Sequence, residues 1–347
     1  MKTLTRNELA SIERLFRLNQ IGLLRSLKKF LDTKYDKVIC TKDFLIAVGD
    51  IPVGLVAHVD TVFTQEPVDI YYDSVKNVLW SPQGLGADDR AGVYAIINII
   101  NSGFKPTVIF TTDEEKGCVG ASILTAHYPI SPVKLKYLIQ LDRRGSDDCV
   151  FYQCNNEEFE DYVESFGFVT NFGTFSDISV ICPEWKMAGV NLSVGYYNEH
   201  DVNENLHIGK LYNTIDKVKK MLVDIDNAKY FEYIPDIAYI NLMKRYLMED
   251  PSAASDNFWK DCKRNGKHIC SCCKEYDFDY NLFPVHNFND NTLEYYCCDC
   301  LSQANDIFWC DECGEPFKSN KLNPEYFDKK VICETCKEHN HEVITNE

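Results

Sequence analysis

The sequence has no long apolar stretch and is short of basic residues. Its longest apolar run, around residues 91–100, is far shorter than the roughly 20 residues that cross a bilayer. The N-terminal residues carry several charges, among them Lys2 and Arg6, and lack the pattern of an export signal. Lysine and arginine number 36 against 53 acidic residues, which gives a formal net charge of −17. We therefore expect a cytoplasmic protein that binds neither membranes nor nucleic acid, since both present anionic surfaces.

Cysteine, in contrast, is abundant and unevenly distributed. Eleven of the 16 cysteines lie from Cys262 onward in a chain of 347 residues. In a reducing cytosol, clustered cysteines indicate metal binding or catalysis rather than disulfide bonds. The asymmetry predicts a separate cysteine-rich module over residues 261–347, which a helical linker over 229–260 joins to a larger domain over 1–228.

The larger domain shows predicted strands that alternate with predicted helices. A capping-box pattern at Thr5 and Glu8 begins a single long helix that ends near Leu31. Beyond it, strands are expected at 53–59, 107–112, 135–141 and 190–195, and helices at 90–101, 119–127, 156–166 and 206–223. Such alternation predicts an α/β fold with a mixed, largely parallel sheet sandwiched by helices.

Residues that commonly bind metals occur where the predicted strands end or a helix begins. They lie in the segments 58–60, 84–92, 111–117, 138–142 and 190–200, and are His58, Asp60, Asp88, Glu114, Glu115, Asp142 and His200. In open α/β sheets, ligands bind outside the carboxyl ends of the strands, so we expect these side chains to meet. Two histidines with several carboxylates suit an open catalytic zinc pair rather than a closed structural site. Taken singly, each segment has an ordinary structural explanation, such as helix capping by Asp88.

In order and chemistry these segments resemble the motifs of the co-catalytic dinuclear zinc exopeptidases. This family includes peptidase T-like tripeptidases, aminopeptidases and related carboxypeptidases, and the resemblance covers about residues 50–225. It implies the zinc exopeptidase fold and a cis peptide bond between Asp88 and Asp89. It implies that Asp88 bridges two metals, that His58 and Asp142 complete one metal site, and that Glu115 and His200 complete the other. It further implies that Glu114 is the general base and that Asp60 orients His58.

The implied activity is that of a metal-dependent exopeptidase, which cleaves short peptides with a water molecule that two divalent metal ions activate. The metal is expected to be zinc, with cobalt or manganese as alternatives. Many relatives insert a dimerisation or lid domain between the fourth and fifth motifs. Residues 143–199 number only 57 here, so we expect a compact catalytic domain without that insertion. An N-acyl amino acid deacylase, or another amidohydrolase on the same scaffold, is an alternative enzyme. A catalytically inert adaptor that acts through the cysteine-rich module is an alternative of another class.

Four further residues are candidates for contact with a substrate. Arg143 could pair bidentately with a substrate carboxylate, although neutralisation of the neighbouring acidic residues is the favoured alternative. Ser176 and Asp177 lie where the resemblance places substrate-contacting loops, and a turn with a helix cap is their alternative. Tyr197 is expected to line the pocket or to pack in the core.

The cysteine-rich module contains four C-x-x-C pairs with the spacing of zinc ribbons. Paired in order, they predict two structural zinc sites, formed by Cys270, Cys273, Cys297 and Cys300 and by Cys310, Cys313, Cys333 and Cys336. Cys272 and Cys298 offer alternative registers, and nearby histidines could replace a sulfur ligand. Because acidic residues outnumber basic ones from Cys262 onward, we expect a protein partner or a purely structural role for the module.

Overall fold

The computed structural model describes residues 2–173 and 175–236 and, beyond them, the stretches 267–269, 271–272, 276–278, 282–290, 292–297, 300, 304, 306–309 and 316–319. These residues fall into two compact units. The first contains residues 2–39 and the described residues from 43 to 236, and the second contains residues 40–42 and the described residues from 267 onward. In this part of the chain no helix is long and apolar enough to cross a membrane.

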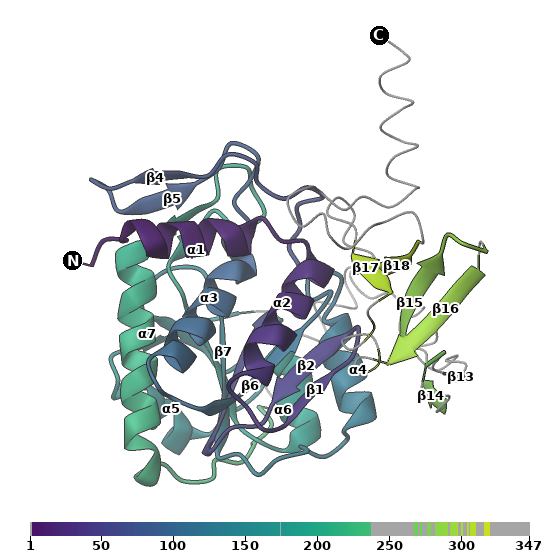
Figure 1. Cartoon of the computed structure of the whole chain (residues 1–347). Helices are drawn as coiled ribbons and strands as arrows, with labels where there is room; N and C mark the ends of the chain where they lie inside the picture. Colours follow the sequence, from purple (N-terminus) through teal and green to yellow (C-terminus); the bar gives the residue numbers. More distant parts are fainter. Residues whose placement is uncertain are drawn as a thin grey trace, which may run out of the picture. The chain divides into compact units, whose positions relative to one another are not determined.

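An eight-stranded sheet forms the centre of the first unit, with the strand order β1-β2-β6-β3-β7-β10-β8-β9 (Figure 1). The four strands β6, β3, β7 and β10 run parallel to one another. β2 pairs with β6, and β8 with β10, in the antiparallel sense. The predicted mixed, largely parallel sheet is therefore confirmed. Its strands are β1 (Val38–Cys40), β2 (Phe44–Ala47), β3 (Ile51–His58), β6 (Pro106–Thr111), β7 (Tyr137–Arg143), β8 (Asp148–Val150), β9 (Val169–Thr170) and β10 (Gly189–Ser193).

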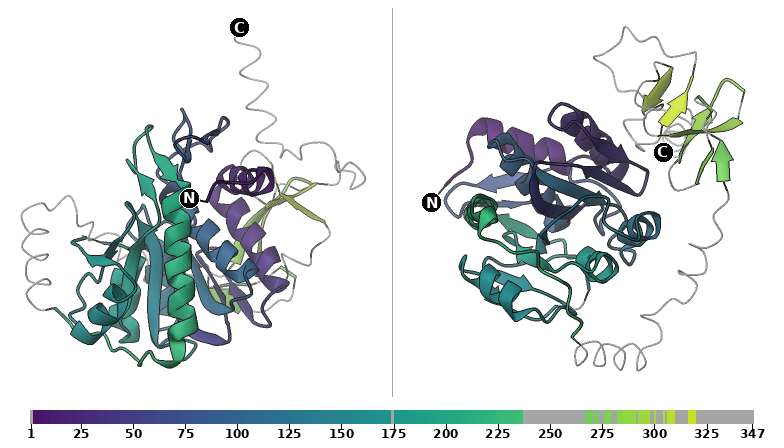
Figure 2. Two further views of the ribbon diagram at one scale, coloured as in Figure 1. Left: turned by 90° about the vertical axis from the view of Figure 1, so that its left-hand side faces the viewer. Right: turned by 90° about the horizontal axis from the view of Figure 1, so that it is seen from below.

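Helices cover both faces of this sheet, as predicted (Figure 1, Figure 2). α3 contacts α7 on one face, and α4 contacts α6 on the other. The connections from β3 to β6 and from β6 to β7 run in opposite directions along the sheet, so right-handed crossovers place α3 and α4 on opposite faces. The helices are α1 (Arg6–Phe16), α2 (Gln20–Asp32), α3 (Ala87–Asn101), α4 (Val119–His127), α5 (Glu157–Glu164), α6 (Asp177–Trp185) and α7 (Ile208–Val223), which the short 3₁₀ helix η1 (Asp224–Asp226) follows.

The central strands are buried on both sides, which explains their continuous apolar sequence. All residues of β6 and of β10 are buried, and so are the last six of β3. Parallel strands that helices cover on both faces have no solvent-facing side, and they therefore lack alternation of polar and apolar residues. Polar side chains at the carboxyl ends of these strands, such as His58 on β3 and Asp142 on β7, therefore stand out against an apolar background.

The single long helix expected at the N-terminus is wrong, because the chain forms two helices there. α1 begins with the predicted capping box between Thr5 and Glu8 and ends at Phe16. Asn19 then caps α2 by accepting a hydrogen bond from the backbone N–H of Gly22 at 2.7 Å. Apolar spacing does not reveal the break, since the buried side chains keep a helical spacing across it, at Ile12, Phe16, Leu23 and Leu27.

A second, antiparallel sheet with the order β11-β12-β5-β4 lies beyond the ends of the central strands. Its strands are β4 (Tyr71–Asp73), β5 (Val78–Trp80), β11 (Tyr196–Tyr197) and β12 (Asn205–His207). β11 directly follows β10 and leads into the loop that carries His200. The small sheet thereby anchors this loop at both of its ends.

The first unit extends past the expected boundary at residue 228. Residues 229–236 are not helical and form bridges, of Glu232 with Met187 and of Pro235 with Cys154. The side chain of Phe231 is buried against the rings of Tyr137, Phe159 and Tyr162. The rest of the expected linker, residues 237–260, lies outside the described residues.

The second unit contains short strands in two sheets. β13 (Lys267–Ile269) pairs with β14 (Tyr276–Phe278), and a four-stranded sheet has the order β16-β15-β18-β17. The strands of that sheet are β15 (Leu282–Asn287), β16 (Thr292–Cys297), β17 (Ile307–Trp309) and β18 (Pro316–Lys318), and the residues buried at its core are Val285, Tyr296 and Ile307.

Most of the predicted zinc ligands of this unit lie outside the described residues. Cys300 is described and is partly buried, whereas only the backbone of Cys297 is described, at the end of β16. The remaining six are Cys270, Cys273, Cys310, Cys313, Cys333 and Cys336. The two Cys₄ sites therefore stay a prediction.

Candidate metal centre

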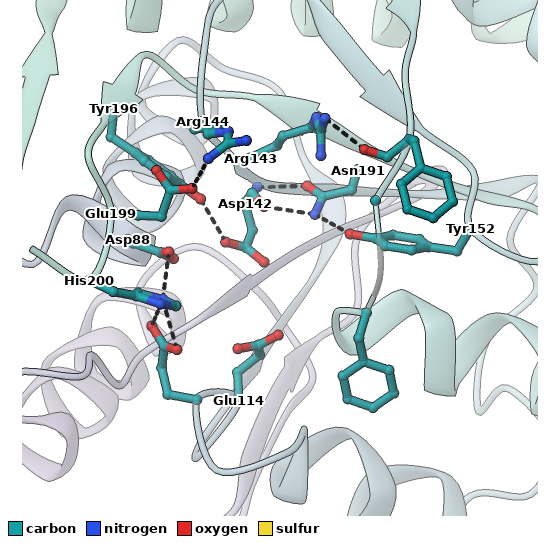
Figure 3. A pocket seen from close by; sticks show the side chains of 14 residues that line it. Asp88, Glu114, Asp142, Arg143, Arg144, Tyr152, Asn191, Tyr196, Glu199 and His200 are labelled. Atoms are coloured by element: carbon teal, nitrogen blue, oxygen red, sulfur yellow. Dashed lines mark hydrogen bonds and ion pairs between the residues drawn. The ribbon is translucent and has the colours of Figure 1, made fainter. Parts of the chain in front are cut away.

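The metal-ligand candidates from the sequence meet at the carboxyl ends of the parallel strands, and Figure 3 shows Asp88, Glu114, Asp142 and His200 of this set. His58 is the last residue of β3, and Asp142 lies near the end of β7. Glu114 and Glu115 stand in the turn after β6, Asp88 lies at the start of α3, and His200 lies in the loop after β11. Residues separated by more than 140 positions in the chain thus share one end of the sheet.

His58, Asp88 and Asp142 form a first group that could hold a metal ion. The Nε2 atom of His58 lies 3.1 Å from Oδ1 of Asp88 and 3.5 Å from Oδ1 of Asp142. All three side chains are buried, and that of His58 is only 1% exposed. A cation bound among them would therefore be held by three buried side chains, two of which, Asp88 and Asp142, also line the pocket described below.

Asp88, Glu115 and His200 form a second group. The Nε2 atom of His200 lies 3.0 Å from the carboxylate of Glu115 and 3.4 Å from Oδ2 of Asp88 (Figure 3). Asp88 thus turns one carboxylate oxygen toward His58 and the other toward His200. This is the arrangement in which one carboxylate can bridge two cations. His58, Glu114 and Glu115 form a third combination with converging ligand atoms.

Asp60 holds both His58 and the acidic turn in place. Its Oδ1 atom lies 3.2 Å from Nδ1 of His58, so that the imidazole presents Nε2 to the first group. Its two oxygens also accept hydrogen bonds from the backbone N–H groups of Glu114 and Glu115, at 3.0 and 3.1 Å. Burial raises the pKa of Asp60, but the hydrogen bonds from His58 and from this turn outweigh it and keep the pKa below its usual value.

The charges of the two groups are balanced only when protons or cations accompany them. Burial, reinforced by the nearby charge of Asp88, raises the pKa of Asp142 to about 6. Hydrogen bonds to Asp88 and Glu115 raise the pKa of His200 to about 10, and Asp142, Asp60 and Asp88 raise that of His58 although burial opposes this. Clustered carboxylates of this kind favour bound cations.

The donor set is one that divalent cations accept. Imidazole nitrogens and carboxylate oxygens are ordinary zinc ligands, and neither group is closed by four protein ligands. Manganese and cobalt accept the same donors. The chemistry of the residues that are present is therefore consistent with a pair of divalent cations.

Glu204 supports the centre and was not predicted from the sequence. Its carboxylate, 1% exposed, accepts hydrogen bonds from the backbone N–H groups of Ala87 and Asp88, both at 3.0 Å. Burial, together with the charge of Asp88, raises the pKa of Glu204 to about 7. As an isolated acidic residue in a polar loop, it carries no sequence signal that distinguishes it from a surface residue. The cis peptide bond expected between Asp88 and Asp89 is present beside it.

Asp142 is positioned by two hydroxyl groups. Ser176 donates a hydrogen bond to its Oδ2 atom at 2.7 Å, and Tyr196 donates one to its Oδ1 atom at 3.1 Å. Ser176 is buried and does not line the pocket described below, so its position favours orientation of Asp142 over substrate contact. Asp177 is fully buried and accepts a hydrogen bond from the hydroxyl of Thr111, again without lining the pocket.

A pocket of about 450 Å³ opens over the two groups. Arg143 lines it, as predicted for a substrate contact, whereas Tyr197 does not and instead accepts a hydrogen bond from Lys210. Its lining residues are Asp88, Glu114, Glu115, Asp142, Arg143, Arg144, Tyr152, Phe172, Gly173, Phe175, Asn191, Tyr196, Glu199 and His200. The pocket thus combines carboxylates, two arginines and aromatic side chains.

No family model and no curated protein matches this sequence. Solved structures, however, are similar in fold. The structure of aminopeptidase PepT from Bacillus cereus ATCC 10987 matches 63% of this chain and 98% of its own, with a TM-score of 0.51 and 15% sequence identity. A tripeptidase from Staphylococcus aureus subsp. aureus Mu50 gives the same coverage and TM-score at 14% identity. At these identities the similarity establishes that the chain shares the fold of these two peptidases.

Proposed function

We propose that this chain is a metal-dependent exopeptidase that hydrolyses short peptides. The observation that carries the proposal is the position of Asp88, which belongs to two convergent ligand groups at once, with Glu114 beside them in the same pocket. The fold shared with an aminopeptidase and a tripeptidase supports a peptide as the substrate. A pocket of about 450 Å³ suits a short peptide.

In this proposal His58, Asp88 and Asp142 hold one divalent ion, and Asp88, Glu115 and His200 hold the other. Zinc is the first choice, with cobalt and manganese as alternatives. When bound, the two ions would polarise the scissile carbonyl and lower the pKa of water. The other protein groups then act on proton positions and on the orientation of the ligands.

Glu114 is the proposed general base. Burial raises its pKa well above the usual value for a glutamate, and the charges of Asp142 and Asp88 add to this while His58 opposes it. A base with a raised pKa takes a proton and returns it more readily near neutral pH. Glu114 would accept a proton from the attacking water and deliver it to the nitrogen of the leaving amine. Asp60 fixes the backbone of Glu114 through the hydrogen bond already described.

The test compares the wild type with Glu114→Gln on a library of short peptides with free and blocked termini, with added zinc. We expect stepwise removal of residues from one terminus by the wild type, and a loss of at least about 10²-fold in rate for the variant. Glu158→Gln is the matched control, because Glu158 is exposed and its ion pair among the described residues is with the exposed Lys229 at the surface. A chelator should abolish the activity, and zinc should restore it.

Two results would overturn the proposal. The first is wild-type protein with bound zinc that trims no peptide, and the second is full activity in Glu114→Gln. An N-acyl amino acid deacylase would leave the peptides intact but release acetate from N-acetyl amino acids. An inert adaptor would leave both the peptides and the N-acetyl amino acids intact.

The cysteine-rich module is proposed to hold two structural zinc ions through its eight paired cysteines and to offer a surface for a protein partner. With the catalytic pair and the two Cys₄ sites filled, metal analysis should find about four zinc ions per chain. A weak chelator should remove the catalytic pair first, because closed Cys₄ sites release zinc less readily than open catalytic sites. A content of two ions that a weak chelator removes completely would contradict the structural sites.

A further inference from the structure

One arginine in the pocket is neither exposed nor fully paired. The ionisable groups around the pocket are mainly acidic, and Arg143 and Arg144 are the two arginines among its lining residues. Figure 3 shows Asp142 between His200 and Arg143, so Arg143 stands on the side of the pocket away from His200. The two arginines have different surroundings, and this difference carries the inference.

Arg144 already has a partner and is hydrated. Its Nη1 atom lies 2.9 Å from Oε1 of Glu199, and its side chain is 65% exposed (Figure 3). An exposed ion pair of this kind contributes little to binding or stability. Arg144 is therefore accounted for without a ligand.

Arg143 is largely removed from water, with a side chain that is 14% exposed. Its Nη2 atom donates a hydrogen bond to the carbonyl oxygen of Phe172 at 3.0 Å. Its ion pair within the described residues is with Oδ2 of Asp148 at 3.6 Å, and this carboxylate also accepts a hydrogen bond from Asn171 at 2.9 Å. The Nε atom of Arg143 is buried and has no hydrogen-bond partner among the residues that the structure describes.

A largely buried guanidinium whose ion pair is as long as 3.6 Å keeps part of its charge uncompensated, and an anion bound in the pocket that Arg143 lines would stabilise it. Guanidinium recognises carboxylates in particular, because its planar fork can donate two parallel hydrogen bonds to the two oxygens. Phe172 and Phe175, both exposed, and the buried Tyr152 line the same pocket. The surroundings of Arg143 thus suit the carboxylate of an amino acid that has an apolar side chain.

We infer that Arg143 binds the free α-carboxylate of the substrate's C-terminal amino acid, and that the amide bond of this residue is the one cleaved. The inference rests on the proposed function and names its substrate class. Arg143 and the proposed ligand Asp142 line the same pocket of about 450 Å³. A carboxylate at the guanidinium and an amide bond at the metal centre would therefore share one cavity.

The reaction is then hydrolysis of the last amide bond. Water adds to the carbonyl carbon, the C–N bond breaks, and the proton passes to the nitrogen of the released C-terminal amino acid. A dipeptide and an N-acyl amino acid both offer this chemistry. The group on the acyl side distinguishes them, and the experiment includes both.

The first arm changes the substrate and leaves the protein intact. Alanyl-phenylalanine and N-acetylphenylalanine are each compared with their C-terminal amides on the zinc-supplemented full chain. We expect kcat/KM to be at least about tenfold higher for the free acid than for the amide, the effect of about one charge-assisted hydrogen bond. Cleavage of the dipeptide alone identifies a peptide source, and cleavage of N-acetylphenylalanine alone identifies an acyl source. Equal cleavage of acid and amide would overturn the inference and leave the proposed function standing.

The second arm changes the arginine. Arg143→Gln should reduce the ratio of acid to amide to about one, whereas Arg144→Gln removes the same charge from the adjacent residue and should keep the wild-type ratio. Retention of the preference in Arg143→Gln, or its equal loss in both variants, would contradict a specific role for Arg143. Thermal unfolding of the variants shows whether each one is folded.

A third arm does not depend on turnover. Calorimetry measures binding of the same four compounds to zinc-loaded Glu114→Gln protein and to the double variant with Arg143→Gln. If the wild type cleaves none of the compounds, but binding still requires both the carboxylate and Arg143, the result would uphold this inference and refute the proposed hydrolase. Binding that ignores the carboxylate would refute the inference whatever the activity.

Discussion

Replacement of Gly92 by alanine tests the close contact on which the metal centre depends. Gly92 lies in α3, four residues after Asp88, where the helix passes the end of β7. A Cβ atom at this position would lie 2.1 Å from the backbone oxygen of Leu141 and 2.7 Å from the carboxylate of Asp89. Leu141 immediately precedes Asp142. The helix and strand that touch here therefore carry two ligands of the first group.

The size of the effect follows from these distances. An ordinary Cβ contact begins at 3.4 Å, so the backbones would have to separate by about 3.4 − 2.1 = 1.3 Å. Overpacking of this kind costs about 1–3 kcal/mol, and a rigid backbone oxygen places it at the upper end. Alanine regains up to about 1 kcal/mol through its higher helix propensity. We expect a net loss of about 2 kcal/mol in the free energy of unfolding, and weaker zinc binding because Asp88 and Asp142 move apart.

Urea unfolding measured by far-UV circular dichroism reports on this unit, because helices α1–α7 all belong to it. Zinc affinity is measured by competition with a chelator. Gly22→Ala is the control, since Gly22 also lies in a helix but its Cβ atom would meet side-chain atoms alone, the nearest being Oδ1 of Asn19 at 3.0 Å, and these can shift more easily than a backbone oxygen. The control should stay within about 0.5 kcal/mol of the wild type. If Gly92→Ala is as stable as this control and binds zinc equally well, the contact between α3 and β7 does not constrain residue 92.

Two further predictions concern the groups around the centre. Zinc affinity should fall as the pH is lowered from 8 to 6. The pKa of His200 is raised to about 10, so the metal-free imidazole carries a proton that zinc must displace. Chelator competition at several pH values measures this affinity, and an affinity that does not depend on pH would contradict the prediction. Glu204→Ala should cost about 1–3 kcal/mol in stability and weaken zinc binding, because two buried backbone N–H groups lose their acceptor. Urea unfolding and zinc titration test this prediction, with Glu158→Ala as the control at an exposed site. Equal stability and equal zinc affinity of the two variants would refute it.

The arrangement of the candidate site could be foreseen because it follows from one rule of topology. His58, Glu115 and Asp142 each lie at or just beyond the end of a strand, and parallel strands present those ends at one edge. Local sequence identifies the strands, and the rule brings their ends together. No knowledge of side-chain packing was needed for this step.

Features that depend on tertiary contacts were not foreseeable in the same way. The helix cap weighed at Ser176 and Asp177 is confirmed at the start of α6, but the helix itself is absent from the expected elements because Pro183 interrupts the helical pattern, although the structure accommodates it inside the helix. The role of Glu204 depends on how the loop after His200 folds back onto α3, which no local pattern encodes. The second role of Asp60, as acceptor for the turn that contains Glu114, likewise requires the sheet to be formed.

The spacing of the ligands along the chain has a consequence for synthesis at the ribosome. The first group is complete in sequence at Asp142, whereas the second needs His200, 200 − 142 = 58 residues later. At about 5–20 residues per second this interval lasts about 3–12 s. β10, which pairs with β7, is made only within that time. A nascent chain would thus pass through a stage with one complete ligand group and no partner group, and the proposed hydrolytic activity would be withheld until nearly the whole first unit has been translated.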